Sequence, residues 1–164
     1  MKRYGHLKIL GGNYGYTNSE QVGEVVPIIT EANLTSDFTV TQAYSDAAGA
    51  GMATVTGLSV TFTATGGPTL LSFVGCAALP EANTTDLFYG YKLDSDTAIV
   101  CGTVFGLVGA GEMNISFSLW LTGLTAASHT IIFQASSSQG TDPIIKALFG
   151  TSRARKTSLQ VAQY

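Results

Sequence analysis

The sequence predicts an all-β protein whose main part is one antiparallel β-sandwich. Three observations predict this fold class: apolar and polar residues alternate with a period of two, turn residues separate these segments at intervals of about 8–12 residues, and no helix is needed to explain the pattern. With 164 residues, the chain is long enough for one domain with a hydrophobic core and too short for two.

Two segments show the alternation most clearly. Residues 58–65 alternate apolar side chains with Ser and Thr, and residues 112–122 do so with Asn, Ser, Trp and Thr. Gly66-Gly67-Pro68 ends the first segment, because proline cannot donate a hydrogen bond to a central strand. Residues 54–55 begin the same run as residues 58–65, before a break at Gly57. The other expected strands are residues 69–74, 87–93, 97–104, 129–136, 144–149 and 158–164, with a tight turn at Asp94-Ser95-Asp96. Together they make about eight strands, which is the number in a jelly roll.

The first fifty residues have a weaker pattern. A flexible start with aromatic residues at 11–16 precedes a polar stretch, and small residues at 47–51 suggest a hinge. Residues 25–30 and 38–42 could be strands. We therefore expect residues 1–50 to form an extended N-terminal attachment arm and residues 52–164 to form the jelly-roll domain.

Charge is scarce in this sequence. Charged residues make up 12% of the chain, whereas about a quarter is usual, and residues 47–80 and 113–141 contain no Asp, Glu, Lys or Arg. Depletion of charge is typical of the core of a protein–protein interface and favours an oligomer. The alternative is a sandwich surface hydrated through Ser and Thr hydroxyls. The net charge of −3 argues against nucleic acid as a partner.

Neither an export signal nor a membrane span is predicted. The basic start Met1-Lys2-Arg3 is followed by polar residues and glycines instead of the apolar run of a signal peptide. Apolar runs of about eighteen residues are also missing. We expect a protein made in the cytoplasm, with Cys76 and Cys101 as buried free thiols and a single disulfide as the alternative.

Groups for catalysis or metal binding are few. His6 and His129 are the only histidines, and no Ser, Cys or Thr stands in a nucleophile motif. Asp94 and Asp96 are the only close carboxylate pair, and their place in a turn is a sufficient structural reason for them. A calcium site that adds Asp86 is the alternative. We expect no enzymatic activity, no metal and no cofactor; a polysaccharide depolymerase would need acids clustered in a groove.

Aromatic residues at otherwise polar positions are the candidate contacts with a neighbouring subunit. Trp120 stands among small polar residues, and Tyr89 and Tyr91 lie in a strand whose other side carries Phe88. A strand that is apolar on both sides packs between a core and a second partner. We expect Tyr89, Tyr91 and Trp120 to lie at a subunit interface. A Trp that merely caps the edge of the sandwich is the alternative.

Several segments resemble a known family. The run Val55-Thr56-Gly57-Leu58-Ser59-Val60-Thr61-Phe62-Thr63-Ala64-Thr65-Gly66-Gly67-Pro68, then Leu70-Leu71-Ser72-Phe73, is similar to the start of the jelly-roll domain of phage tail-fibre and head-fibre proteins. The hairpin at 88–94, the turn and strand at 123–130, and Ser158-Leu159-Gln160-Val161 follow the same order and spacing. The resemblance covers residues 52–164.

This resemblance implies a homotrimer of the tumour-necrosis-factor-like type on the surface of a virion. The expected function is a capsid decoration protein or short head fibre; the alternative is a receptor-binding tail-fibre or tail-tip module that contacts host glycans through loops 80–85 or 136–142. In the first case the arm contacts the major capsid protein or another virion protein. The candidate attachment residues are Lys2, Arg3, Tyr4, Lys8, Tyr14 and Tyr16.

Overall fold

The computed structural model describes residues 6–9, 12–15, 26–44, 51–78, 85–105, 111–138, 143–149 and 155–164, and these residues form strands and loops without a helix. The strands are β1 (His6–Ile9), β2 (Gly12–Gly15), β3 (Ile28–Asn33), β4 (Phe38–Thr39), β5 (Ala53–Thr63), β6 (Thr69–Ala78), β7 (Leu87–Leu93), β8 (Ile99–Val104), β9 (Glu112–Leu121), β10 (Ser128–Ser137), β11 (Ile144–Lys146), β12 (Leu148–Phe149), β13 (Arg155–Lys156) and β14 (Ser158–Gln163). In this part of the chain, no helix is long and apolar enough to cross a membrane.

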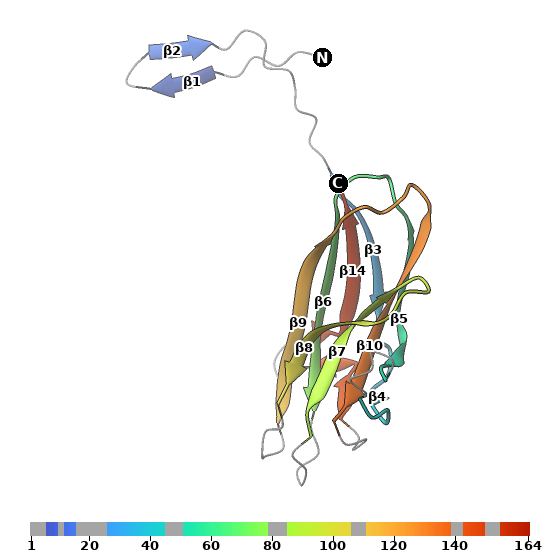
Figure 1. Ribbon diagram of the computed structural model, residues 1–164. Coiled ribbons are helices and arrows are strands. Elements are labelled where there is room, and N and C mark those ends of the chain that lie inside the picture. The colour runs from blue at the N-terminus through green and yellow to red at the C-terminus, as the bar shows by residue number, and fades with distance from the viewer. Residues whose placement is uncertain are drawn as a thin grey trace.

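Two antiparallel sheets pack face to face (Figure 1). One sheet has the order β5-β10-β7-β8. The other is organised around β6, which pairs with β9 along one edge and with β14 and then β11 along the other; β3 lies beyond β14, and β4 beyond β11. The eight longest strands of the sandwich thus divide into β3-β14-β6-β9 and β5-β10-β7-β8. In addition, β1 pairs with β2 and β12 with β13.

A β-bulge interrupts the pairing of β5 with β10. The sequence suggested a break at Gly57, but β5 continues through it, and the register to β10 shifts between Ile132 and Gln134. Gly57 has a φ of 95°, a conformation that glycine adopts without steric cost. The bulge allows Val55 and Leu58 both to point into the core, where each is fully buried.

The core is centred on stacked aromatic rings between the two sheets. Phe73 of β6 and Phe133 of β10 are fully buried, and their ring centroids are 4.0 Å apart. Phe117 of β9 lies 5.6 Å from Phe73 and closes the stack on one side. Aromatic pairs at such distances add about 0.5–1.5 kcal/mol beyond the burial of their area. The stack therefore holds the two sheets together at their centre.

The sandwich begins well before residue 52. Within the range expected to be the arm, β3 pairs with β14 over six residues, and β4 pairs with β11. Leu34 and Val40, between and after these strands, are buried in the core, and their N–H groups donate to Thr157 O and Pro143 O at 2.9 and 2.8 Å. Residues 26–44 therefore belong to the sandwich, because β3 and β4 pair with its strands and Leu34 and Val40 are buried in its core.

The expected strand at 144–149 is divided into β11 and β12 at Ala147. The Ala147 N–H donates to Asp37 Oδ1 at 2.8 Å, and Lys146 Nζ lies 2.5 Å from Asp37 Oδ2. These two bonds lower the pKa of Asp37. Asp37 thus fixes the turn of the backbone between the two short strands.

Candidate association surface

The outward side of β3, β14, β6 and β9 is the most unusual surface of the sandwich, and we call it the association face. Alternate residues of these strands, such as Leu71, Leu159 and Leu121, point into the core, so the residues between them point outward. The registers place these outward residues in rows across the four strands. The first three rows are Ile29, Ala162, Leu70 and Trp120; then Glu31, Gln160, Ser72 and Ser118; then Asn33, Ser158, Val74 and Ser116.

The first row is apolar across the whole width of the sheet. Ile29 is 60% exposed and Trp120 is 55% exposed. Tyr164, which follows β14, is 45% exposed, and its ring centroid lies 5.6 Å from that of Trp120. Exposed apolar side chains that adjoin one another mark interaction sites more often than isolated ones.

The association face is nearly free of charge. In the three rows, all of them described, the only charged side chain is Glu31, which accepts a hydrogen bond from Gln160 Nε2 at 3.1 Å. In the described part of this sheet, further charged groups come toward its other end, at Glu112 of β9 and at Lys146 and Asp37. A desolvated contact on this face would therefore bury few charges.

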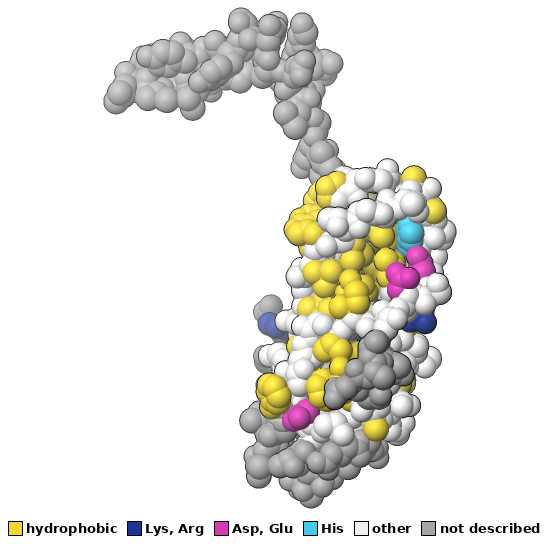
Figure 2. All heavy atoms as spheres, viewed as in Figure 1, with side chains coloured by type: hydrophobic (Ala, Val, Ile, Leu, Met, Phe, Trp, Pro, Cys, Tyr) yellow, Lys and Arg dark blue, Asp and Glu magenta, His cyan; other side chains and the backbone are white. Residues whose placement is uncertain are grey.

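A second apolar surface lies at the edge where β8 and β9 each end their sheet, and we call it the open edge. Ile99 and Phe105 are 52% and 73% exposed there, and Phe117 and Leu119 of β9 are half-buried. Figure 2 views this side of the molecule and shows hydrophobic side chains gathered between β9 and β10. The open edge and the association face are different surfaces that meet at β9.

The outward side of the other sheet has the opposite character. Ser59, Thr61 and Thr63 of β5 are exposed, and Thr61 Oγ1 lies 3.0 Å from Thr130 Oγ1 of β10. Hydroxyl groups make this part of the sheet polar without charge. Hydroxyl side chains thus stand on the outward side of one sheet, and an apolar row crosses the outward side of the other.

Of the three candidate interface residues, the structure leaves only Trp120 on the surface. Tyr89 and Tyr91 are 8% and 5% exposed and belong to the core, where both contact the ring of Phe117. Burial raises the pKa of both hydroxyls. Their strand is apolar on both sides, but these two tyrosines lie on the side that faces the other sheet of the same chain.

The arm candidates are largely outside the described residues. Lys8 lies in β1 and Tyr14 in β2, of which the structure describes the strands alone. Lys2, Arg3, Tyr4 and Tyr16 lie outside the described residues. Their role in attachment stays a prediction.

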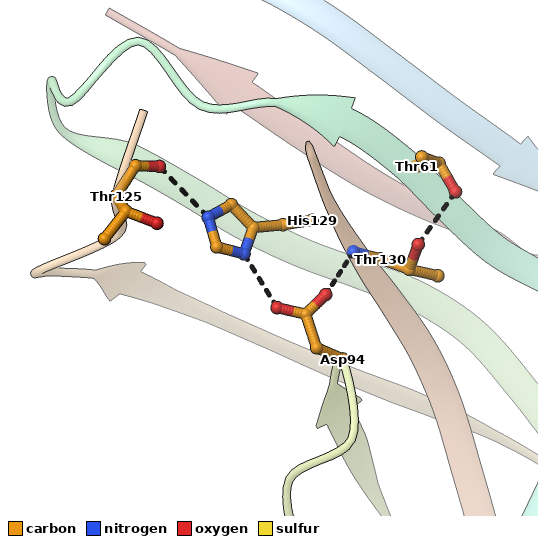
Figure 3. Close-up of polar contacts among 5 residues, drawn as sticks. All are labelled: Thr61, Asp94, Thr125, His129 and Thr130. Carbon is orange, nitrogen blue, oxygen red and sulfur yellow. Dashed lines mark hydrogen bonds and ion pairs between the residues drawn. The ribbon is translucent and has the colours of Figure 1, made fainter. Parts of the chain in front are cut away.

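Among the described residues, the one close pair of a histidine with an acid is His129 with Asp94 (Figure 3). Both ring nitrogens of His129 are occupied, by Asp94 Oδ2 at 2.7 Å and by Thr125 O at 3.0 Å. Neither nitrogen is therefore free to take a proton from a nucleophile. No group of three or more metal-ligating side chains occurs in the described part of the chain.

Cys76 and Cys101 are free thiols. Cys76 is buried as expected, whereas Cys101 is only half-buried, and burial raises the pKa of each thiol to about 11. A thiol with so high a pKa is protonated near neutral pH and is a poor nucleophile.

Comparison with known proteins identifies the fold. No protein-family model matches the sequence, and no curated protein matches it. A chain in the structure of infectious bursal disease virus Gt strain superposes with a TM-score of 0.50 over 96% of this chain at 14% identity. The fold is a jelly roll. This jelly roll spans 37% of the length of that viral chain.

The structure of Eiger TNF from S. frugiperda is also similar, with a TM-score of 0.49 and 11% identity over 84% of this chain and 92% of that one. At such identities the likeness concerns the fold. The two antiparallel sheets and the superposition on the viral chain confirm the jelly-roll sandwich that the sequence predicts.

Proposed function

We propose that this protein is a structural component of a bacteriophage particle, present on the virion surface as a homotrimeric capsid decoration protein or short head fibre. The association face carries this proposal. A sheet side with one charged side chain in three rows and an apolar row that ends in Trp120 is suited to contact with a second copy of the chain.

The two apolar surfaces favour a ring over a two-fold dimer. A two-fold interface uses the same patch on both partners, whereas a contact between two different patches joins copies head to tail and closes a ring when the rotation allows. The association face and the open edge are two such patches on one chain. The number three follows from the resemblance to trimeric phage jelly-roll domains.

Two considerations support a place on a virion. The jelly roll is similar to a chain of a virus structure, and the sequence resembles phage fibre domains. In this proposal the residues before β3, with Lys2, Arg3, Tyr4, Lys8, Tyr14 and Tyr16, contact the major capsid protein, and the jelly roll projects outward. The work of the protein is then binding through several copies at once, without catalysis.

A matched pair of variants tests the association face in solution. Ser118→Arg places a guanidinium in the second row of this face, and Ser59→Arg makes the same change on the hydroxyl side of the other sheet. Both serines are exposed, so each variant is expected to fold. Burying an unpaired charge costs several kcal/mol, so Ser118→Arg should dissociate the trimer.

Light scattering after size-exclusion chromatography gives the mass. We expect three times the 17.1 kDa of one chain for the wild type and for Ser59→Arg, and one chain mass for Ser118→Arg. A monomeric wild type, or equal masses for the two variants, would exclude the proposed trimer.

Cryo-electron microscopy of the particle tests the location. Density for three jelly rolls standing on the capsid surface supports the decoration role. Density confined to the tail tip would overturn it in favour of a receptor-binding module.

A further inference from the structure

A side-chain cluster centred on His129 joins two segments that are distant in the sequence, the turn after β7 and the loop before β10 (Figure 3). His129 lies near the start of β10, Asp94 directly follows β7, and Thr125 lies in the loop between β9 and β10. His129 Nδ1 is 2.7 Å from Asp94 Oδ2, and His129 Nε2 is 3.0 Å from Thr125 O. One imidazole ring therefore links the β9–β10 loop to the β7–β8 turn.

The chemistry of the two partners determines the protonation state of the ring. A carboxylate and a backbone carbonyl are both acceptors, so each ring nitrogen must donate a hydrogen. A neutral imidazole has one N–H, whereas an imidazolium has two. The geometry thus requires the doubly protonated, positively charged form of His129.

Asp94 is held in place to receive this charge. Its Oδ1 accepts from the Thr130 N–H at 2.7 Å, and its own N–H donates to Thr130 O at 2.8 Å. Asp94 also has a φ of 49°, a turn conformation that Asp tolerates better than most residues. The carboxylate therefore keeps its position whether or not His129 is charged.

The other elements around His129 carry little charge. Phe62 of β5 lies against the ring, with centroids 6.0 Å apart, and residues 122–128 contain no ionisable side chain. The remaining charged groups on the neighbouring elements are Lys92 of β7 and Asp96 of the turn. Asp94 is thus the charged partner in contact with the ring.

We propose that His129 is a pH-dependent latch that holds the β9–β10 loop against the β7–β8 turn and releases the loop when the ring loses one proton. The neutral ring keeps its single N–H on the Asp94 carboxylate, because hydrogen bonds to a charged acceptor are the stronger ones. Nε2 then presents a lone pair to the Thr125 carbonyl, and two acceptors repel each other. The loop is the part that moves.

The sign of the pH dependence follows from the same contacts. The hydrogen bonds with Asp94 and Thr125 raise the pKa of His129, and those with His129 and Thr130 lower the pKa of Asp94. The contribution of His129 is complete below the ordinary histidine value of about 6.5 and is lost as the pH rises through the raised pKa. In acid, the latch opens as the pH falls through the lowered pKa of Asp94.

The latch bears on the association face because of where the loop begins. Trp120 and Leu121 end β9, and the loop held through Thr125 follows directly. The far end of the loop is fixed independently, since the Ala64 N–H donates to Ala127 O at 2.8 Å. Within the loop, the Ala127 N–H donates to Thr125 O at 2.7 Å and Leu124 packs against the core, and both contacts remain when the His129 bond is lost. Loss of that bond therefore frees the loop only from the β7–β8 turn and loosens it next to the exposed Trp120. This inference does not rest on the proposed function.

NMR of the ¹⁵N-labelled protein tests the protonation state. The chain has two histidines, and His6→Gln leaves the ring signals of His129 alone. At pH 6 we expect both ring nitrogens of His129 to show the shifts of protonated nitrogen, and we expect titration above 6.5. A single neutral tautomer at pH 6 would overturn the latch.

Two variants in the same turn separate the specific contact from a general effect of charge. Asp94→Asn should lower the pKa of His129 by about 1–3 units, because it removes the contacting charge. Asp96→Asn removes the same charge from the same turn and should leave the pKa of His129 nearly unchanged. Equal shifts in the two variants would refute the specific pairing.

Backbone dynamics test the release of the loop. Order parameters of amides 123–126 should fall when the wild type passes from pH 6 to a pH above the pKa of His129, and His129→Gln should show the looser loop at both pH values. Loop order that is the same on both sides of the titration would contradict the proposal even if the charged form is present.

Discussion

Trp120 offers the sharpest test of the association face, through the change Trp120→Ala. Its side chain is 55% exposed in the single chain. A Trp side chain has about 250 Å² of surface, so about 140 Å² is left to bury against a partner, which at about 25 cal/mol per Å² amounts to about 3 kcal/mol. That loss weakens one subunit contact roughly a hundredfold.

Sedimentation equilibrium over a range of protein concentrations measures this change. Ile132→Ala is the control, because Ile132 is a half-buried apolar residue on the outward side of the other sheet. Circular dichroism should show that both variants keep the β fold, since Trp120 lies outside the core. The reasoning fails if Trp120→Ala leaves the dissociation constant within a few-fold of the wild type, or if Ile132→Ala weakens association equally.

Two further predictions concern the single chain. Gly90→Ala should destabilise the fold by about 1–3 kcal/mol in urea denaturation, because a Cβ there would overlap the Ile99 carbonyl and approach the Cys101 nitrogen, both backbone atoms of β8. Gly111→Ala is the control and should have little effect, because nothing lies within 4 Å of its Cβ. Equal losses of stability in the two variants would contradict the steric argument. Ellman's reagent at pH 8 should react slowly with both thiols in the folded protein and completely in urea, because burial raises the pKa of each thiol to about 11. Rapid reaction of the folded protein would show that the two thiols are accessible.

Much of the sandwich could be predicted from the sequence because its central strands alternate. The β7 strand, Leu87–Leu93, has the predicted bounds, and β9 ends one residue before its predicted end. The β3 strand was harder to recognise because it is an edge strand. Ile28 and Ile29 are both about 60% exposed, so two adjacent apolar residues replace the alternation, and the sequence pattern placed them in an arm.

The candidate surface was less predictable, because it depends on register between strands. Alternation shows that Leu70 and Ala162 each share a side with their neighbours two residues away, but only the pairing shows that both stand in one row with Trp120. Alternation likewise could not decide which side of β7 faces the core, since Tyr89 and Phe88 are both aromatic. His129 and Asp94 are 35 residues apart, and only the fold brings them together.

The last strand of the sandwich lies in the middle of a sheet. β14 pairs with β3 on one side and with β6 on the other, although about 130 residues separate β3 from β14. During synthesis, β3 and β6 leave the ribosome without the strand that joins them, and their edges stay unpaired until residue 163 emerges. Closing the sheet requires contacts between distant parts of the chain, which fold slowly. Chaperones that cover exposed strand edges would therefore act on this protein mainly before β14 has left the ribosome and paired.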